Sequence, residues 1–364
     1  MRCRIDRLPG EQPIDESLAC CSNSNLESAA AMPELDVAVI IVTFRSALVT
    51  IDCLRSVDAE RSTAGIKIRA VVVDNASGDF PIIAEAVAAN DWSAWVTCVL
   101  APVNGGFAYG NNLGIRKAYA GGAPAYVHLL NPDAQARPGA ISSLVHFLEA
   151  NPDVGIAGGR FENLDGSDWP FAFRFPSILS ELESRLEVGL VTRLLRPWVV
   201  PVTMPSTSPQ RIDWVSGASL MIRPAVFAAI GGLDENYFLY FEETDFCFRA
   251  KKAGFSTWYV PKSRVMHISG HSTKVDERNT APKRMPHYWF ESRRRFFAVT
   301  YGIDRAMVID IVAVSAHALG FLKRILLFRT RSATPYFLRD LLRYSILRPR
   351  NRAFAPVRSA VLRG

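Results

Sequence analysis

The chain has 364 residues, of which 49% are apolar and 21% are charged, and its formal net charge is +7. This composition excludes a disordered chain and is typical of a globular protein with one large domain or two modest ones. No internal repeat is present, and the six cysteines are scattered without the spacing of a metal site. We therefore expect free thiols in a reducing compartment rather than disulfides.

The positive charge is concentrated towards the C-terminal end. Residues 302–364 contain twelve Arg or Lys and three acidic residues, a net +9, which leaves −2 for residues 1–301. Residues 1–34 are polar, lack the apolar segment of a secretory signal and are expected to be disordered. Met32 is the expected translational start. These features divide the chain into a polar leader (1–34), a main domain (35–301) and a basic amphipathic helical region (302–364).

Strands and helices alternate from residue 35 onward. Residues 35–44 form a continuous apolar, β-branched run, which is typical of a strand buried on both faces. The alternation predicts an α/β fold with a mostly parallel central sheet that is flanked by helices. Residues 160–212 lose this rhythm and are interpreted as an insertion. The predicted strands after the first are 68–74, 95–100, 125–130 and 154–159, and the predicted helices are 46–60, 81–90, part of 104–122 and 138–151.

Two carboxylates follow buried strands, at the edge where open α/β sheets bind ligands. Asp74 can accept a hydrogen bond from a nucleobase or a ribose, or it can cap its own turn. Asp133 follows Asn131 and Pro132 on a rigid turn. A single carboxylate there suits Mg²⁺ or Mn²⁺ bound to a diphosphate, and an ordinary helix N-terminal turn is the alternative.

A glycine-rich segment, "NGGFAYGNN" at 104–112, runs into a predicted helix. Gly105, Gly106 and Gly110 would let the backbone approach a ligand closely, and the start of the helix offers N–H groups for phosphate. The segment matches neither the dinucleotide-binding fingerprint nor a P-loop. Hydride transfer and ATP chemistry are therefore disfavoured.

Three carboxylates crowd the start of another predicted helix, in "YFEETDFCF". The helix dipole alone would stabilise acids at this position. Alternatively, clustered carboxylates beside aromatic residues raise one another's pKa, which makes one of them usable as a general base near neutral pH. The three residues are Glu242, Glu243 and Asp245. His267 ends a predicted strand, and a lone histidine is more often structural than a ligand; His271 is a weaker candidate.

The C-terminal region contains the apolar runs 306–328 and 336–347, which are interleaved with arginines. This pattern is typical of a helix on a membrane surface. A transmembrane span is disfavoured because Asp310 and His317 interrupt the first run. An ordinary helix that packs on the main domain remains the alternative.

In this order, "VIIVTFRS", "VVVDNASGD", "NGGFAYGNNLGI", "LLNPDA" and "YFEETDFCFRAKKAG" resemble the family-2 inverting glycosyltransferases with the GT-A fold, and among them the bacterial rhamnosyltransferase branch. The resemblance covers about residues 35–301. It implies a hexosyltransferase that moves L-rhamnose from dTDP-rhamnose by single displacement with inversion. The acceptor implied is a polyprenyl-diphosphate-linked sugar or a polysaccharide in cell-envelope glycan synthesis.

The resemblance implies metal-binding and donor-binding roles for the residues of this chain that match the family's motifs. The Asp-x-Asp metal motif appears as Asn131-Pro132-Asp133, so Asp133 and His267 are the implied contacts for Mg²⁺ or Mn²⁺. The residues implied to bind the nucleotide-sugar are Thr43, Asp74, Asn104, Gly106, Asn112 and Asp133. The consecutive arginines Arg293–Arg295 either reach a phosphate or form a solvated basic helix face.

One position departs from the family pattern. The usual Glu-Asp pair, whose Asp is the base, appears here as Glu242-Glu243. We expect Glu243 to be the base, with Asp245 in support and Glu242 as the other candidate. The departure leaves open a nucleotide-sugar-binding protein that has lost catalysis.

The resemblance also implies where the protein acts. A cytoplasmic enzyme, peripheral on the inner face of the cytoplasmic membrane, would use its C-terminal helical region to reach a lipid-linked acceptor. Nucleic acid is not an expected partner, because the main domain has no platform of aromatic and basic residues. The same scaffold with a UDP-sugar, such as UDP-galactofuranose, UDP-glucose or UDP-N-acetylglucosamine, is the nearest alternative.

Overall fold

The computed structural model describes residues 36–63, 65–163, 166–169, 172–186, 188–202, 207–267, 283–327 and 334–347. By its internal contacts the chain divides into Met1–Glu34 and Leu35–Gly364. The predicted leader, with Met32, and the histidine His271 lie outside the described residues. The boundary predicted after residue 301 falls inside the second unit, between two helices.

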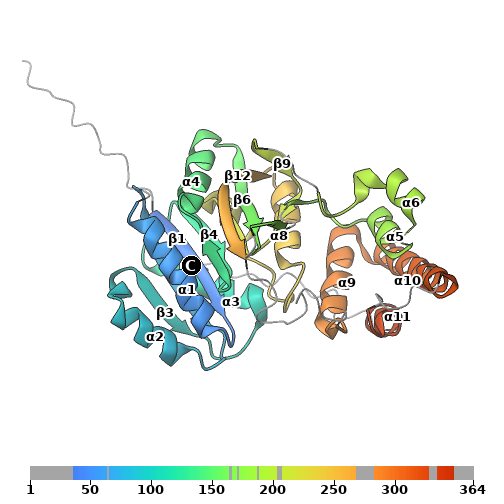
Figure 1. Ribbon diagram of the computed structural model, residues 1–364, viewed down its shortest axis with the longest axis horizontal. Coiled ribbons are helices and arrows are strands. Elements are labelled where there is room, and N and C mark those ends of the chain that lie inside the picture. Colours follow the sequence, from blue (N-terminus) through green and yellow to red (C-terminus); the bar gives the residue numbers. More distant parts are fainter. Residues whose placement is uncertain are drawn as a thin grey trace, which may run out of the picture. The chain divides into compact units, whose positions relative to one another are not determined.

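The first half of this unit alternates strands and helices as predicted (Figure 1). Its elements are β1 (Asp36–Thr43), α1 (Ala47–Arg61), β2 (Lys67–Asp74), α2 (Phe80–Ala89), η1 (Trp92–Ala94), β3 (Val96–Leu100), α3 (Gly106–Ala120), β4 (Tyr126–Leu130), β5 (Ala134–Ala136), α4 (Ala140–Ala150) and β6 (Val154–Glu162). The short strand β5 was not predicted, because three residues carry no periodic signal.

The second half is less regular, and its strands are short. Its elements are β7 (Asp168–Trp169), β8 (Ala172–Phe173), α5 (Ile178–Leu186), α6 (Gly189–Leu194), η2 (Arg196–Trp198), β9 (Gln210–Ile212), β10 (Trp214–Val215), β11 (Ser219–Ile222), α7 (Pro224–Ile230), α8 (Glu242–Lys252), β12 (Ser256–His267), α9 (His287–Tyr301), α10 (Ile303–Leu326), α11 (Phe337–Leu341) and η4 (Leu342–Ile346), which is a π-helical turn. The insertion predicted to be irregular therefore contains two helices, α5 and α6.

The main sheet has the strand order β3-β2-β1-β4-β11-β6-β12-β5, with β7 and β9 attached to β6 and β12. It is parallel from β3 to β4, while β11 runs antiparallel between β4 and β6. Because β12 is parallel to β6, the carboxyl ends of β1, β2, β4 and β12 lie along one edge. The predicted α/β class is confirmed, and the sheet is mixed where short strands replace the strand–helix alternation.

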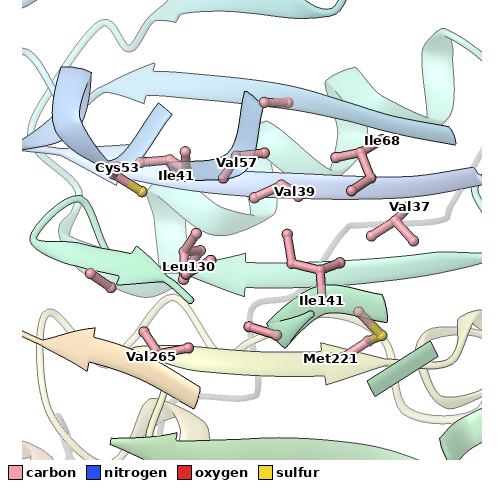
Figure 2. Packing of buried hydrophobic residues seen from close by; sticks show 14 of the residues in the cluster. Val37, Val39, Ile41, Cys53, Val57, Ile68, Leu130, Ile141, Met221 and Val265 are labelled. Atoms are coloured by element: carbon pink, nitrogen blue, oxygen red, sulfur yellow. The ribbon is translucent and has the colours of Figure 1, made fainter. Parts of the chain in front are cut away.

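Helices cover both faces of the sheet. Alternate residues of β1 enter opposite cores: Val37, Val39 and Ile41 pack with α1, α2 and α4, and the residues between them pack with α3, α7 and α8. Figure 2 shows the first group beside Cys53 and Val57 of α1. Burial of these β-branched side chains on both sides fixes the strand ends that carry the candidate site.

The C-terminal helices pack on the insertion. Helix α10 contacts α5 and α9, and Gly320 allows the crossing, since a Cβ there would lie 2.3 Å from the Arg185 carbonyl oxygen. Lys323 Nζ donates to the Leu186 carbonyl at 3.0 Å. The insertion at 160–212 therefore packs against α10, the first helix of the basic region 302–364.

The three consecutive arginines of α9 are buried in ion pairs, so neither predicted role describes them. Arg293 contacts Asp310 at 2.6 Å and Glu181 at 3.0 Å. Arg294 pairs with Asp310 at 2.5 Å, and Arg295 Nε pairs with Asp234 at 2.8 Å. A guanidinium at 0–5% exposure requires such partners, because an unpaired buried charge is costly. The arginines join α9 to α5, α10 and the segment before α8.

Candidate active site

A cleft of 520 Å³ lies at the carboxyl edge of the sheet. It is lined by Val42, Phe44, Asn75, Asn104, Gly106, Phe107, Asn131, Pro132, Asp133, Ser216, Gly217, Ala218, Phe238, Leu239, Tyr240, Glu242, Glu243, His267 and Tyr288. A second cavity, of 410 Å³, lies by β9 and the amino end of β12 and contains none of the predicted site residues. The first cleft is therefore the candidate active site, as expected for this edge of an open sheet.

Asp133 and His267 contact each other in the lining of the cleft. Asp133 Oδ1 lies 3.2 Å from His267 Nε2, and Asn131 Nδ2 lies 3.4 Å from the same nitrogen. Strand β5 makes this contact possible: it follows Asp133 directly and pairs with β12, with Ala134 opposite His267. The Asp133 carboxylate suits a divalent cation that takes other ligands from a diphosphate and water, and the His267 imidazole offers a nitrogen ligand beside it. Among the residues described, no group of three or more His, Cys, Asp or Glu gathers as a metal site.

Glu242 and Glu243 stand at the start of α8, and both line the cleft. In each, Oε2 is buried and has no hydrogen-bond partner. Burial raises the pKa of both carboxyls, and the charge of Glu243 raises the pKa of Glu242 further. Backbone hydrogen bonds, including one from Gly217, moderate the rise at Glu243. These backbone hydrogen bonds favour the ionised form of Glu243, which agrees with the expectation that Glu243 is the base.

The segment before these carboxylates has a strained backbone. Tyr240 and Phe241 have φ of 71° and 68°, a region that costs about 1–3 kcal/mol for each non-glycine residue. The Phe107 N–H donates to the Phe238 carbonyl at 2.8 Å and holds the segment against α3. A Cβ on Gly106, which has φ of 87°, would lie 2.0 Å from that carbonyl oxygen. Gly106 is thus needed for a protein contact in addition to its place in the cleft.

Asn104 reaches the cleft, but two predicted nucleotide contacts are occupied within the protein. The Thr43 hydroxyl donates to Asp79 at 2.8 Å. Asp74 accepts from the Ser77 backbone at 2.8 Å and from the Phe80 backbone at 3.0 Å, as the turn-capping alternative describes. Neither side chain lines the cleft. Their contact with a nucleotide remains a prediction.

Asn112 and Asp245 also lie away from the cleft lining. Asn112 donates to the Leu233 carbonyl at 2.8 Å and accepts from the Leu233 N–H at 3.0 Å, so its amide is engaged within the protein. Asp245 pairs with Arg249 at 2.7 Å, and Arg249 holds the carbonyl of Gly232 at 3.0 Å. Asp245 would therefore support the base only indirectly, through Arg249 and the backbone at Gly232.

Sequence reasoning missed Phe44, Asn75 and Tyr288, which line the cleft. Phe44 and Asn75 each follow the last residue of a strand, which is a signal that could have identified them. Gly217 lies between the Phe107 ring and Glu243, where a Cβ would be 3.2 Å from the ring. Tyr288 comes from α9 and had no local signal.

The cleft thus combines a carboxylate–histidine pair at a strand edge with two buried carboxylates at a helix start. Residues 33–282 match the sequence profile described as glycosyltransferase-like family 2, and the chain belongs to this family.

Two curated relatives within this similarity are rhamnosyltransferases. The chain is 33% identical over 153 residues to N-acetylglucosaminyl-diphospho-decaprenol L-rhamnosyltransferase of Mycobacterium tuberculosis, which covers 42% of this chain and 49% of that protein. It is 23% identical over 173 residues to rhamnosyltransferase WbbL of Escherichia coli, which covers 46% of this chain and 63% of that protein. The chain thus matches about half to two thirds of the length of these relatives.

A solved structure shares the fold. GalNAc-T7, crystallised with UDP, GalNAc and Mn²⁺, superposes with a TM-score of 0.51 at 15% identity, over 86% of this chain and 59% of that chain. The GT-A fold predicted from the sequence is confirmed.

Proposed function

We propose that the protein is an inverting glycosyltransferase that transfers L-rhamnose from dTDP-rhamnose to a lipid-linked sugar in cell-envelope glycan synthesis. The carrying observation is that Asp133, His267 and Glu243 line one cleft. The names of the two rhamnosyltransferase relatives support the sugar, and that of the mycobacterial relative supports an acceptor of the glycosyl-diphospho-lipid class.

The proposed reaction is a single displacement. The oxygen of an acceptor hydroxyl bonds to the anomeric carbon of the donor, and the bond from that carbon to the diphosphate oxygen breaks. The electron pair leaves with the nucleoside diphosphate, and the hydroxyl proton passes to Glu243. Asp133 and His267 would hold a Mg²⁺ or Mn²⁺ ion, which supplies positive charge against the departing diphosphate. Asn75 and Asn104, which hydrogen bond to each other at 3.0 Å, line the side of the cleft nearest β2.

Asp133→Asn tests the metal role. We expect the Mn²⁺-dependent part of dTDP-rhamnose binding to weaken about 10–100-fold, because an amide is a much poorer ligand than a carboxylate. Calorimetric titration of the donor with and without Mn²⁺ measures this. Asp52→Asn, which removes an exposed carboxylate on α1, is the matched control. Equal Mn²⁺-dependent affinity in Asp133→Asn and the wild type would contradict the assignment.

The same titration over a donor panel separates the alternatives. Selective binding of a UDP-sugar would keep the mechanism and change the sugar. Donor binding without hydrolysis or transfer would favour a nucleotide-sugar-binding protein that has lost catalysis. The replacement of the family's usual Asp by Glu243 is the observation that keeps this alternative open.

We also propose that α10 lies on the cytoplasmic face of the membrane. Among the described residues, α10 alone is long and apolar enough to cross a membrane, by length and composition only. A surface position is favoured because Asp310 is buried in ion pairs with α9. The outward side of the helix is apolar, with exposed Met307, Val308, Ile311, Leu319, Phe321, Leu322, Ile325 and Leu326. Such a face beside a basic region suits an anionic lipid surface.

The double variant Leu322→Glu, Leu326→Glu tests this face. We expect it to lose binding to vesicles that contain anionic lipid, because two charges would enter the apolar boundary, and to keep donor hydrolysis. Vesicle co-sedimentation measures the binding. Leu48→Glu, at an exposed leucine of α1, is the control. Unchanged sedimentation of the double variant would refute the surface role.

A further inference from the structure

Three aromatic side chains form one wall of the cleft. Phe238 and Tyr240 come from the segment before α8, and Tyr288 comes from the first turn of α9. The Tyr240 and Tyr288 rings are 6.1 Å apart and nearly parallel, at 19°, and the Phe238 and Tyr288 rings are 5.3 Å apart. Phe238 is 39% exposed, so the wall presents aromatic surface to the cleft.

One face of α9 holds this wall in place. Ser292, one turn after Tyr288, donates from Oγ to the Leu239 carbonyl at 3.0 Å. Arg295, a further turn along, holds Asp234. Tyr288, Ser292 and Arg295 are at positions i, i+4 and i+7, which share one helix face. This face of α9 therefore lies along the segment from Asp234 to Tyr240. The aromatic wall is built from two parts of the chain that these contacts fasten together.

The composition of the cleft indicates what the wall binds. Among the described residues that line it, none is Lys or Arg. The wall therefore suits a neutral group better than a diphosphate, whose charge the metal pair at Asp133 is placed to meet. A sugar ring carries a face of weakly positive C–H groups, which matches the negative face of an aromatic ring. Tyr240 and Glu243 line the same cleft.

We propose that Phe238, Tyr240 and Tyr288 are the acceptor subsite, a platform on which the acceptor sugar ring stacks with its attacking hydroxyl turned to Glu243. This inference rests on the proposed transfer reaction. The left-handed backbone at Tyr240 and Phe241 is then the strain that aims an aromatic ring and the base carboxylate at the same ligand.

The test compares Tyr288→Ala and Tyr288→Phe with the wild type. The acceptor probe is N-acetylglucosaminyl diphosphate that carries a short alkyl chain, and the donor is dTDP-rhamnose with Mn²⁺. We expect Tyr288→Ala to raise the Kd and the KM of the probe about tenfold, and Tyr288→Phe to stay within about twofold, because the phenyl ring provides the stacking surface. Donor Kd, measured without acceptor, is the readout that distinguishes a wall for the acceptor from a wall for the donor. Tyr336→Ala, at an exposed tyrosine outside the cleft, is the control.

The outcomes separate the two proposals. In one outcome, the wild type binds the probe, Tyr288→Ala binds it more weakly, and neither protein transfers sugar. This result would support the platform and contradict the transfer reaction. Equal probe affinity in Tyr288→Ala and the wild type would overturn the platform whatever the turnover. A rise in donor Kd instead would assign the wall to the donor and would also overturn the proposal. Should Tyr288→Ala fold poorly, Tyr288→Leu keeps the apolar volume without the ring and should show the same loss for the probe.

Discussion

Glu243→Gln should lower the rate of sugar transfer about 10²–10⁴-fold and leave donor affinity nearly unchanged. The amide keeps the shape of the side chain but cannot take the proton of the acceptor hydroxyl. Steady-state transfer assays and donor titration measure the two effects. Glu85→Gln, at an exposed position of α2, is the control for loss of a carboxylate. Should Glu242→Gln abolish transfer while Glu243→Gln retains it, the base would be Glu242.

The pH dependence of transfer gives an independent check. Burial raises the pKa of Glu243, and only the ionised form acts as a base. The rate should therefore rise with pH, with its acid limb displaced above the pKa of about 4.3 of an ordinary glutamate. An acid limb at that ordinary value would contradict a buried base. The protonated form is favoured in the fold, so the associated stability is present at low pH and is lost as pH rises through the raised pKa.

Arg293→Met should lower the free energy of unfolding by about 3–5 kcal/mol, because Asp310 and Glu181 would be left buried with fewer partners. Urea denaturation followed by circular dichroism measures this. Arg55→Met, which breaks an exposed pair with Asp52, should cost less than about 1 kcal/mol. A similar small loss in both variants would show that the buried pairs contribute little.

The loss in Arg293→Met should depend on pH. Burial alone would raise the pKa of Glu181, but Arg293 and Arg185 hold it below its ordinary value. Such a group stabilises the fold above its unfolded pKa, and this stability is lost as pH falls through the folded pKa. The difference between Arg293→Met and the wild type should therefore shrink under acid conditions.

The parallel half of the fold was predictable because its strands are continuous apolar runs separated by helical periods. Strands β5 and β11 were not, since they are short and their pairing depends on distant partners. Asp133, His267, Glu242 and Glu243 were predicted from strand ends and a helix start, and they line one cleft.

The direction of a side chain was harder to predict than its place at a strand end. Thr43 and Asp74 lie at the predicted edge, yet their oxygens bond to neighbouring loops. Asn112 turns to the Leu233 backbone for the same reason: a buried polar group takes the nearest partner that the fold offers. The arginines Arg293–Arg295 had two predicted roles and fill neither, because sequence alone did not show that their partners Glu181 and Asp234 lie beside α9.

Consecutive arginines on one helix have a mechanical consequence. Gly302, with φ of 88°, separates α9 from α10 and would by itself be a flexible joint. Asp310 of α10 restrains this connection because it pairs with Arg293 and Arg294 of α9. Arg295 pairs with Asp234, in the segment that leads to Glu242 and Glu243. These ion pairs connect α10, through α9, to the segment that carries Phe238 and Tyr240. On the membrane surface proposed for α10, this rigid connection would hold the cleft at a constant distance from the bilayer.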